Sequence, residues 1–150
     1  GLKNPNVYIP ELQKEKNLSR FEASDFYSNT KTSSLDILND NNFYLINIWS
    51  SWCLPCREEH DYLIKLKEQN LIKLIGINYK DNFKNAKKFL NEMGNPYSKI
   101  LKDKNGTVSI QLGAYGVPET FIIDKNKKII KKIIGPIDNK IYNEILLIIK

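Results

Sequence analysis

The chain has 150 residues, of which 41% are hydrophobic and 27% charged, and its formal net charge is +6 at pH 7. These values predict one globular domain that buries its own core, and the presence of only two cysteines excludes a small disulfide-dense scaffold. The positive charge comes from scattered lysines with only two arginines, which is typical of a solvated surface, and we expect no nucleic-acid partner.

The N-terminal stretch Gly1–Ser19 is polar, and Pro5 and Pro10 interrupt any periodic pattern, so we expect it to lie along the surface. Because the sequence does not begin with methionine, we also expect that a membrane anchor or signal segment ahead of it has been removed. No apolar run approaches the ~20 residues that span a bilayer. The expected organisation is a polar N-terminal extension over residues 1–20 and one domain over residues 21–150.

Short elements are expected before the first long apolar run. Phe21–Phe26 and Lys31–Ser33 flank a turn-like stretch and are expected to form a small hairpin. Ser34 is expected to cap a short helix that ends near Leu38, where an Asn- and Asp-rich loop follows.

The centre of the chain alternates between apolar runs and amphipathic segments. This alternation of strand and helix implies parallel strands joined by right-handed crossovers. The expected elements are a buried strand Phe43–Ser50, a helix from Cys53 to about Gln69, a strand Ile72–Asn78, and a helix capped by Asp81 or Asn82 that ends at Gly94-Asn95-Pro96.

The C-terminal part differs from the centre. Thr120–Asp124 and Ile129–Ile134 are joined by a short polar turn and predict an antiparallel hairpin, and an amphipathic helix is expected from about Asn139 to Lys150. Together with the central elements, this predicts an α/β fold with a mixed sheet flanked by helices on both faces.

The two cysteines lie at Cys53 and Cys56, in the sequence W-C-x-x-C, where the predicted central strand gives way to a helix. The start of a helix carries unsatisfied N–H groups and a partial positive charge, which favour an anion. A thiolate is such an anion, and the pKa of a cysteine in this setting falls from about 8.5 to between about 7 and about 3.5. The motif therefore indicates redox chemistry, with the Cys53–Cys56 disulfide in place of a separate cofactor.

Two other interpretations of the cysteine pair are weaker. A closed zinc site needs four ligands, and His60 is the only histidine that could help to complete one, so we expect no metal. A purely structural disulfide across so short a loop removes little entropy from the unfolded chain.

Four segments together resemble one family, the extracytoplasmic thioredoxin-like proteins of cytochrome c maturation, called DsbE or CcmG. These segments are Asn47-Ile-Trp-Ser-Ser-Trp-Cys-Leu-Pro-Cys-Arg-Glu-Glu-His60, Gly76-Ile-Asn-Tyr-Lys-Asp81, Gly94-Asn-Pro-Tyr97 and Gly113-Ala-Tyr-Gly-Val-Pro-Glu-Thr-Phe-Ile-Ile-Asp124. The resemblance covers residues from about Phe21 to the C-terminus, and it implies a thioredoxin fold with an N-terminal hairpin extension.

The resemblance also implies an activity and a location. The protein would be a periplasmic thiol:disulfide oxidoreductase tethered to the inner membrane, and it would touch the membrane only through the anchor that this chain lacks. It would reduce the disulfide of the haem-attachment cysteines of apocytochrome c, or a mixed disulfide with a maturation partner. A membrane thiol transporter of the DsbD or CcdA type would reduce it in turn.

Cys53 is expected to be the nucleophile, because it lies at the extreme start of the helix, and Cys56 is expected to resolve the mixed disulfide. Thioredoxins carry an aspartate at the position of Asn47, and an amide cannot accept the Cys56 proton. Another carboxylate is therefore needed. Glu59 lies three residues after Cys56 on the same helix face and matches a glutamate of the family, and Glu119, directly after Pro118, is the second candidate.

Substrate contacts are expected beside the cysteines. Val117-Pro118 resembles the cis-proline turn of the fold, and the Val117 main chain is expected to pair with an extended substrate segment. Trp52 is expected to be a partly exposed contact beside Cys53, Trp49 is expected to lie in the core, and His60 is expected to be a packing or surface residue rather than a catalyst.

Three alternatives remain open at the level of the sequence. A general thioredoxin-like reductase would lack any preference for a C-x-x-C-H sequence. A peroxidase of related fold is less consistent with a W-C-x-x-C motif at a strand end. A binding module would hold apocytochrome near Pro118 and leave its disulfide idle.

Overall fold

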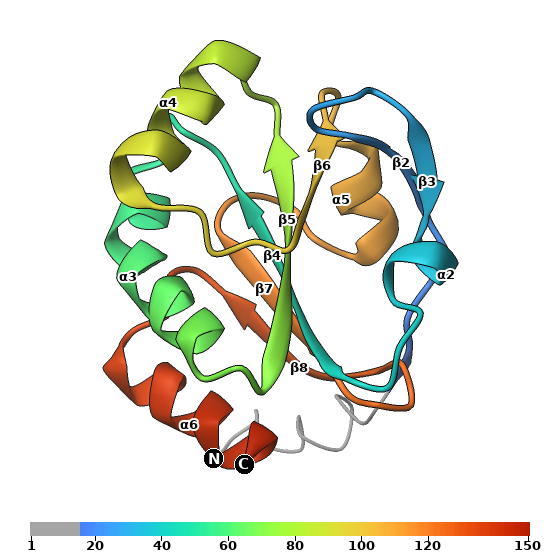
Figure 1. Ribbon diagram of the computed structural model, residues 1–150, viewed down its shortest axis with the longest axis vertical. Coiled ribbons are helices and arrows are strands. Elements are labelled where there is room, and N and C mark those ends of the chain that lie inside the picture. The colour runs from blue at the N-terminus through green and yellow to red at the C-terminus, as the bar shows by residue number, and fades with distance from the viewer. Residues whose placement is uncertain (1–15) are drawn as a thin grey trace, which may run out of the picture.

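An eight-stranded mixed sheet forms the centre of the computed structural model, which describes residues 16–150. The strands lie in the order β1-β8-β7-β4-β5-β6-β2-β3, with helices on both faces (Figure 1). The elements are β1 (Lys16–Asn17), β2 (Glu22–Asp25), β3 (Lys31–Ser33), α2 (Ser34–Ile37), β4 (Phe43–Trp49), α3 (Leu54–Glu68), β5 (Ile72–Tyr79), α4 (Phe83–Met93), β6 (Lys99–Asp103), α5 (Thr107–Leu112), β7 (Glu119–Ile123), β8 (Lys128–Ile134) and α6 (Asn139–Ile149).

The middle of the sheet is built as the sequence predicts. β4 pairs in parallel with β5 and antiparallel with β7, so it has a strand on each side. In this register Asn47 on β4 lies between Gly76 on β5 and Thr120 on β7. The predicted C-terminal hairpin is confirmed as the antiparallel pair β7–β8. The predicted mixed sheet and thioredoxin-type arrangement are therefore confirmed.

Side chains alternate between two cores because successive residues of a strand point to opposite faces of the sheet. On β4, Leu45 and Trp49 point to the core under α3, α4 and α6, whereas Ile46 and Ile48 point to the core under α5. Figure 1 shows the same division, with α3, α4 and α6 on one side of the sheet and α5 and α2 on the other. The chain enters α3 from β4, so residues at the start of α3 lie on the first of these faces.

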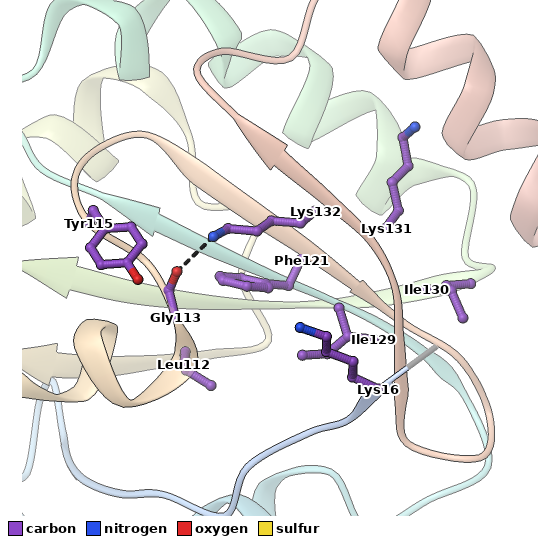
Figure 2. A pocket seen from close by; sticks show the side chains of 9 residues that line it. All are labelled: Lys16, Leu112, Gly113, Tyr115, Phe121, Ile129, Ile130, Lys131 and Lys132. Carbon is purple, nitrogen blue, oxygen red and sulfur yellow. Dashed lines mark hydrogen bonds between the residues drawn. The ribbon is translucent and has the colours of Figure 1, made fainter. Parts of the chain in front are cut away.

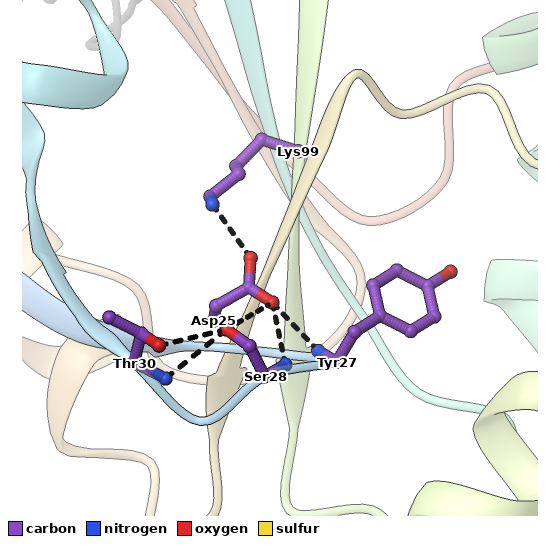
Figure 3. A network of polar contacts seen from close by, with 5 residues as sticks. All are labelled: Asp25, Tyr27, Ser28, Thr30 and Lys99. Carbon is purple, nitrogen blue, oxygen red and sulfur yellow. Dashed lines mark hydrogen bonds and ion pairs between the residues drawn. The ribbon is translucent and has the colours of Figure 1, made fainter.

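The predicted hairpin before β4 is confirmed as the antiparallel pair β2–β3, which extends the sheet beyond β6. Asp25 closes its turn, since one carboxylate oxygen accepts the main-chain N–H groups of Tyr27 and Ser28 at 2.9 Å (Figure 3). The other oxygen pairs with Lys99 on β6 at 2.6 Å. Burial raises the pKa of Asp25, but these contacts outweigh it and lower the pKa to about 2.

Ser34 does not cap α2 as predicted. Ser33 occupies the N-cap position without a side-chain hydrogen bond, and the Ser34 hydroxyl instead accepts the main-chain N–H of Phe21 at 3.1 Å. The cap prediction is wrong because this hydroxyl bonds across the open end of the β2–β3 hairpin, which Phe21 and Ser34 flank, and not within its own helix.

Two regions carry structure that the patterns do not predict. β6 and α5 lie in the stretch between Pro96 and Val117, for which no element is expected from the sequence. Lys16–Asn17, in the predicted extension, forms β1 and pairs with β8, while residues 1–15 of that extension lie outside the described residues. The division into an extension and a domain stays a prediction. Among the described residues no helix is long and apolar enough to cross a membrane.

Candidate active site around the Cys53–Cys56 disulfide

Cys53 and Cys56 form a disulfide at the point where β4 ends and α3 begins. Cys53 is the N-cap residue of α3, and its Sγ accepts the main-chain N–H of Cys56 at 3.2 Å. Pro55 lies in the first turn, where its missing N–H leaves no helical hydrogen bond unmade. When the pair is reduced, this position at the helix start favours a thiolate on Cys53.

Both cysteines are buried, with exposed fractions of 4% for Cys53 and 1% for Cys56. The side chains on either side of Cys53 are not, because Trp52 is 59% exposed and Leu54 is 66% exposed. A pocket of about 280 Å³ lies beside Trp52 and is also lined by Arg57. The buried disulfide is therefore flanked along the chain by two exposed apolar side chains, and the expected order of attack, with Cys53 first, stays a prediction.

The loop that presents the disulfide is held by the loop after β5. Asp81 accepts the main-chain N–H of Ser51 at 2.6 Å and the Ser51 hydroxyl at 2.8 Å. The Trp52 indole N–H donates to the main-chain oxygen of Lys80 at 2.9 Å, so the exposed ring keeps one orientation. Asn78 also donates to Asp81, at 3.0 Å. Asp81 and the Lys80 carbonyl thus tie the segment just before Cys53 to the end of β5.

An Asp81→Ala variant is expected to lose about 2 kcal/mol of unfolding free energy, because hydrogen bonds to a charged group contribute about 1.5–3 kcal/mol. Urea denaturation of the oxidised protein measures this. Asp61→Ala is the matched control, since Asp61 is an exposed carboxylate on α3, and its change should stay within about 0.5 kcal/mol. Equal losses in the two variants would show that the network around Asp81 adds no stability.

Glu59 is fully buried on α3, one turn after Cys56. One carboxylate oxygen accepts the Asn47 Nδ2 group at 2.9 Å, and the other accepts the main-chain N–H of Ile137 at 3.1 Å. Burial raises the pKa of Glu59 to about 7, although both hydrogen bonds oppose the rise. A carboxylate with this pKa exchanges a proton near neutral pH, which suits it to accept one from a thiol.

Glu119 points to the other face of the sheet. It precedes Thr120, which faces Asn47, and one of its oxygens accepts the main-chain N–H groups of Tyr115 at 2.8 Å and Gly116 at 3.0 Å. Its other oxygen lies 3.6 Å from the Lys132 ammonium. The structure therefore brings Glu59, but not the Glu119 carboxylate, to the α3 side of the sheet, and Glu119 anchors the loop that leads to β7.

The loop 113–118 carries the predicted cis bond, and the Val117–Pro118 peptide is cis. Lys132 holds the start of this loop by donating to the Gly113 carbonyl at 2.7 Å (Figure 2). The pocket in Figure 2, about 280 Å³ in volume, is lined by neither cysteine and lies on the α5 side with Phe121. Tyr115, in the same loop, is 81% exposed.

The prediction that Trp49 lies in the core is confirmed, and of the two positions expected for His60, packed or at the surface, the structure shows the packed one. Trp49 is buried and stacks between Phe89 and Tyr97. His60 is buried, its Nε2 lies 2.8 Å from the Gly94 carbonyl oxygen, and burial lowers its pKa. Among residues 16–150 no group of three or more His, Cys, Asp or Glu side chains is placed to hold a metal ion.

Sequence reasoning missed the residues that hold Glu59. Tyr97 donates to the Asn47 carbonyl oxygen at 2.7 Å, and Asn47 donates to Thr120 at 3.1 Å. The available signal was Asn47 itself, because a buried amide in a central strand needs partners for its oxygen and for its NH₂ group.

Comparison with known proteins assigns the family. Residues 8–146 match the family model described as Redoxin. A thiol:disulfide interchange protein DsbE of Haemophilus influenzae is 36% identical over 131 residues, which cover 87% of this chain and 68% of that protein. The chain belongs to the redoxin family and is of the DsbE type.

Further relatives of this redoxin agree. A DsbE of Pseudomonas aeruginosa is 47% identical over 100 residues, which cover 67% of this chain but only 55% of that longer protein. The crystal structure of a putative thiol:disulfide interchange protein DsbE from Chlorobium tepidum superposes with a TM-score of 0.76, covering 91% of this chain and 98% of that one. Its sequence identity is 20%, so it supports the redoxin's fold alone.

Proposed function

We propose that this redoxin is an extracytoplasmic thiol:disulfide oxidoreductase that reduces the disulfide of apocytochrome c haem-attachment cysteines, or a mixed disulfide with a maturation partner. One observation carries the proposal: a C-x-x-C disulfide at a helix start has a buried carboxylate one turn further along the helix, and burial raises the pKa of this carboxylate to about 7. The name that its reported relatives share, thiol:disulfide interchange protein DsbE, supports the same chemistry.

The first step begins from the reduced dithiol. The Cys53 thiolate attacks one sulfur of the substrate disulfide, forming an S–S bond between Cys53 and the substrate and releasing the other substrate sulfur as a thiolate, which takes a proton from water. Stabilisation of the Cys53 thiolate at the start of α3 supports this choice of nucleophile.

The second step releases the substrate. Glu59 takes the proton of the Cys56 thiol, and the resulting thiolate attacks the Cys53 sulfur, so that the Cys53–Cys56 disulfide forms and the second substrate sulfur leaves as a thiolate. This thiolate takes up a proton from water, and Glu59 returns its proton to the solvent. The substrate disulfide gains two electrons and two protons, and the enzyme dithiol loses the same number. Another protein dithiol must therefore reduce the enzyme again, and we assign this to a membrane thiol transporter of the DsbD or CcdA type.

The substrate segment is proposed to lie against the exposed side chains beside the disulfide. Its main chain would pair with the main chain of Val117, next to Pro118, and Trp52 would contact its side chains. The fixed indole of Trp52 and its 59% exposure support this contact. Glu119 would act here by holding the loop that carries Pro118. We place the protein in the periplasm, attached to the inner membrane by a segment ahead of this chain.

Comparison of two substrates tests the proposal. The reduced protein is expected to reduce an oxidised C-x-x-C-H peptide at least about tenfold faster than insulin, because one side-chain contact of about 1–3 kcal/mol gives a preference of this size. A peptide with the same composition and a scrambled order around the cysteines is the control. Equal rates with all three would make the protein a general reductant, and no reduction of any would leave a binding module.

A further inference from the structure

The Tyr97 side chain can approach Asn47 because the residue beside Asn47 on β5 is a glycine. Gly76 is the register partner of Asn47, and a Cβ atom on Gly76 would lie 2.9 Å from the Tyr97 ring. The missing side chain lets the ring lie against the strand, where its hydroxyl meets the Asn47 carbonyl oxygen at 2.7 Å. Thr120 completes the row on the other side of Asn47.

The hydrogen-bond inventory of Asn47 decides which end of its amide faces Glu59. The NH₂ group donates one hydrogen to Glu59 at 2.9 Å and the other to Thr120 at 3.1 Å, while the carbonyl oxygen accepts from Tyr97. If the amide were turned over, its NH₂ group would face Tyr97, and the buried phenol hydrogen would lose its acceptor. A buried donor without a partner is costly, so Tyr97 opposes the turned orientation.

We infer that Tyr97 is a positioning residue for Glu59: its hydroxyl holds the Asn47 amide so that the NH₂ group, and not the carbonyl oxygen, faces the Glu59 carboxylate. The inference rests on the proposed role of Glu59 as the proton acceptor of Cys56. It also gives Asn47 a role. Asn47 stands where thioredoxins carry an aspartate, and its amide donates to Glu59, the carboxylate proposed to accept the Cys56 proton in place of that aspartate.

The orientation of the amide matters because it distinguishes the two protonation states of Glu59. An Asn47 NH₂ group that faces Glu59 donates a hydrogen bond to the carboxylate and favours the ionised form. An Asn47 carbonyl oxygen in the same place would accept a hydrogen bond from the protonated carboxyl group and favour the protonated form. Removal of the Tyr97 hydroxyl gives Asn47 access to the second orientation. Because this second orientation stabilises only the protonated form of Glu59, access to it raises the pKa of Glu59.

Two segments bring titratable groups close to Glu59. On its own helix these are His60, which is bonded to the Gly94 carbonyl instead, and Cys56, one turn earlier, which titrates only when the disulfide is reduced. The segment before β6 presents Tyr97, whose pKa is raised by burial and by the charge of Glu59. The groups that hydrogen-bond to Glu59 are the Asn47 amide from β4 and the Ile137 main-chain N–H from the segment before α6, and neither of them titrates.

A Tyr97→Phe variant tests the inference, because it keeps the ring that stacks on Trp49 and removes only the hydroxyl. The pKa of Glu59 is followed by NMR titration of ¹³C-labelled glutamate carboxyl groups in the oxidised full chain, with the signal assigned by its loss in Glu59→Gln. We expect the pKa of Glu59 to rise by roughly one pH unit in Tyr97→Phe. Tyr44→Phe is the matched control, since Tyr44 is a buried tyrosine bonded to Asp40 on the other face of the sheet, and it should leave the titration unchanged.

An unchanged or lowered pKa in Tyr97→Phe overturns the inference, as does an equal rise in Tyr44→Phe. The titration needs no substrate, so it is independent of the proposed function. The rate of substrate release measured against pH in the reduced protein provides the second readout, and its acid limb should move upward with the pKa of Glu59. If the titration moves and this limb does not, Tyr97 still positions Glu59, but Glu59 is not the proton acceptor.

Discussion

A Cys56→Ser variant should accumulate a disulfide-linked adduct between Cys53 and the substrate, and its turnover should fall on the order of a thousandfold or more. The reason is geometric. The Cα atoms of the two cysteines lie 5.3 Å apart, so Cys56 attacks the mixed disulfide as an intramolecular thiol, with an effective concentration that no thiol in solution matches. Mass spectrometry of the reaction mixture under non-reducing conditions measures the adduct.

Cys53→Ser is the matched variant, and it should lose turnover to the same extent without forming the adduct. It removes the thiolate that the start of α3 stabilises and leaves the more deeply buried Cys56, which is 1% exposed. Adducts in Cys53→Ser and none in Cys56→Ser would reverse the assigned order of attack. Adducts in neither, with turnover retained, would remove the C-x-x-C pair from the chemistry.

Local patterns predict the elements that lie close to the cysteines. The α3 helix is expected over Cys53–Gln69 and found over Leu54–Glu68, and Cys53 and Gln69 are its N-cap and C-cap residues. The prediction succeeds because its signals, the apolar spacing and Pro55, lie within the helix itself. β6 and α5 were missed, since α5 has only six residues and depends on the buried Asp103, whose carboxylate accepts the main-chain N–H groups of its first turn. Tertiary contacts form such a short helix, and propensity does not.

In the candidate site, too, local neighbours can be predicted from the sequence and distant partners cannot. Spacing within one helix brings Glu59 close to Cys56, so the sequence predicts this neighbour. The partners of Glu59 and Asn47 come from residues 50 to 78 positions away, namely Tyr97, Thr120 and Ile137, and a single sequence gives no register between such segments. The amide at Asn47 indicates that partners exist but does not identify them.

As the pH rises from 4.5 to 7, the free energy of unfolding of the wild-type protein should fall by about 3 kcal/mol more than that of Glu59→Gln. The pKa of Glu59 is about 7 in the fold and near 4.5 in the unfolded chain, so in this window the folded state binds more protons and loses stability as the pH rises. Each pH unit contributes about 1.4 kcal/mol. Below pH 4.5 the carboxyl is protonated in both states, and above pH 7 it is ionised in both, so the difference between the two proteins should be constant there.

Urea denaturation of both oxidised proteins at several pH values measures this difference. His60 acts in the opposite sense, because its pKa is lowered in the fold and its contribution rises with pH, but both proteins contain it and the comparison cancels it. Glu58→Gln, at an exposed neighbouring position, should follow the wild type at every pH. If Glu59→Gln also runs parallel to the wild type, Glu59 ionises in the fold at its ordinary pKa and cannot hold a proton near neutral pH. The buried carboxylate would then accept the Cys56 proton no better than a surface glutamate, and the second step of the proposed cycle would need another acceptor.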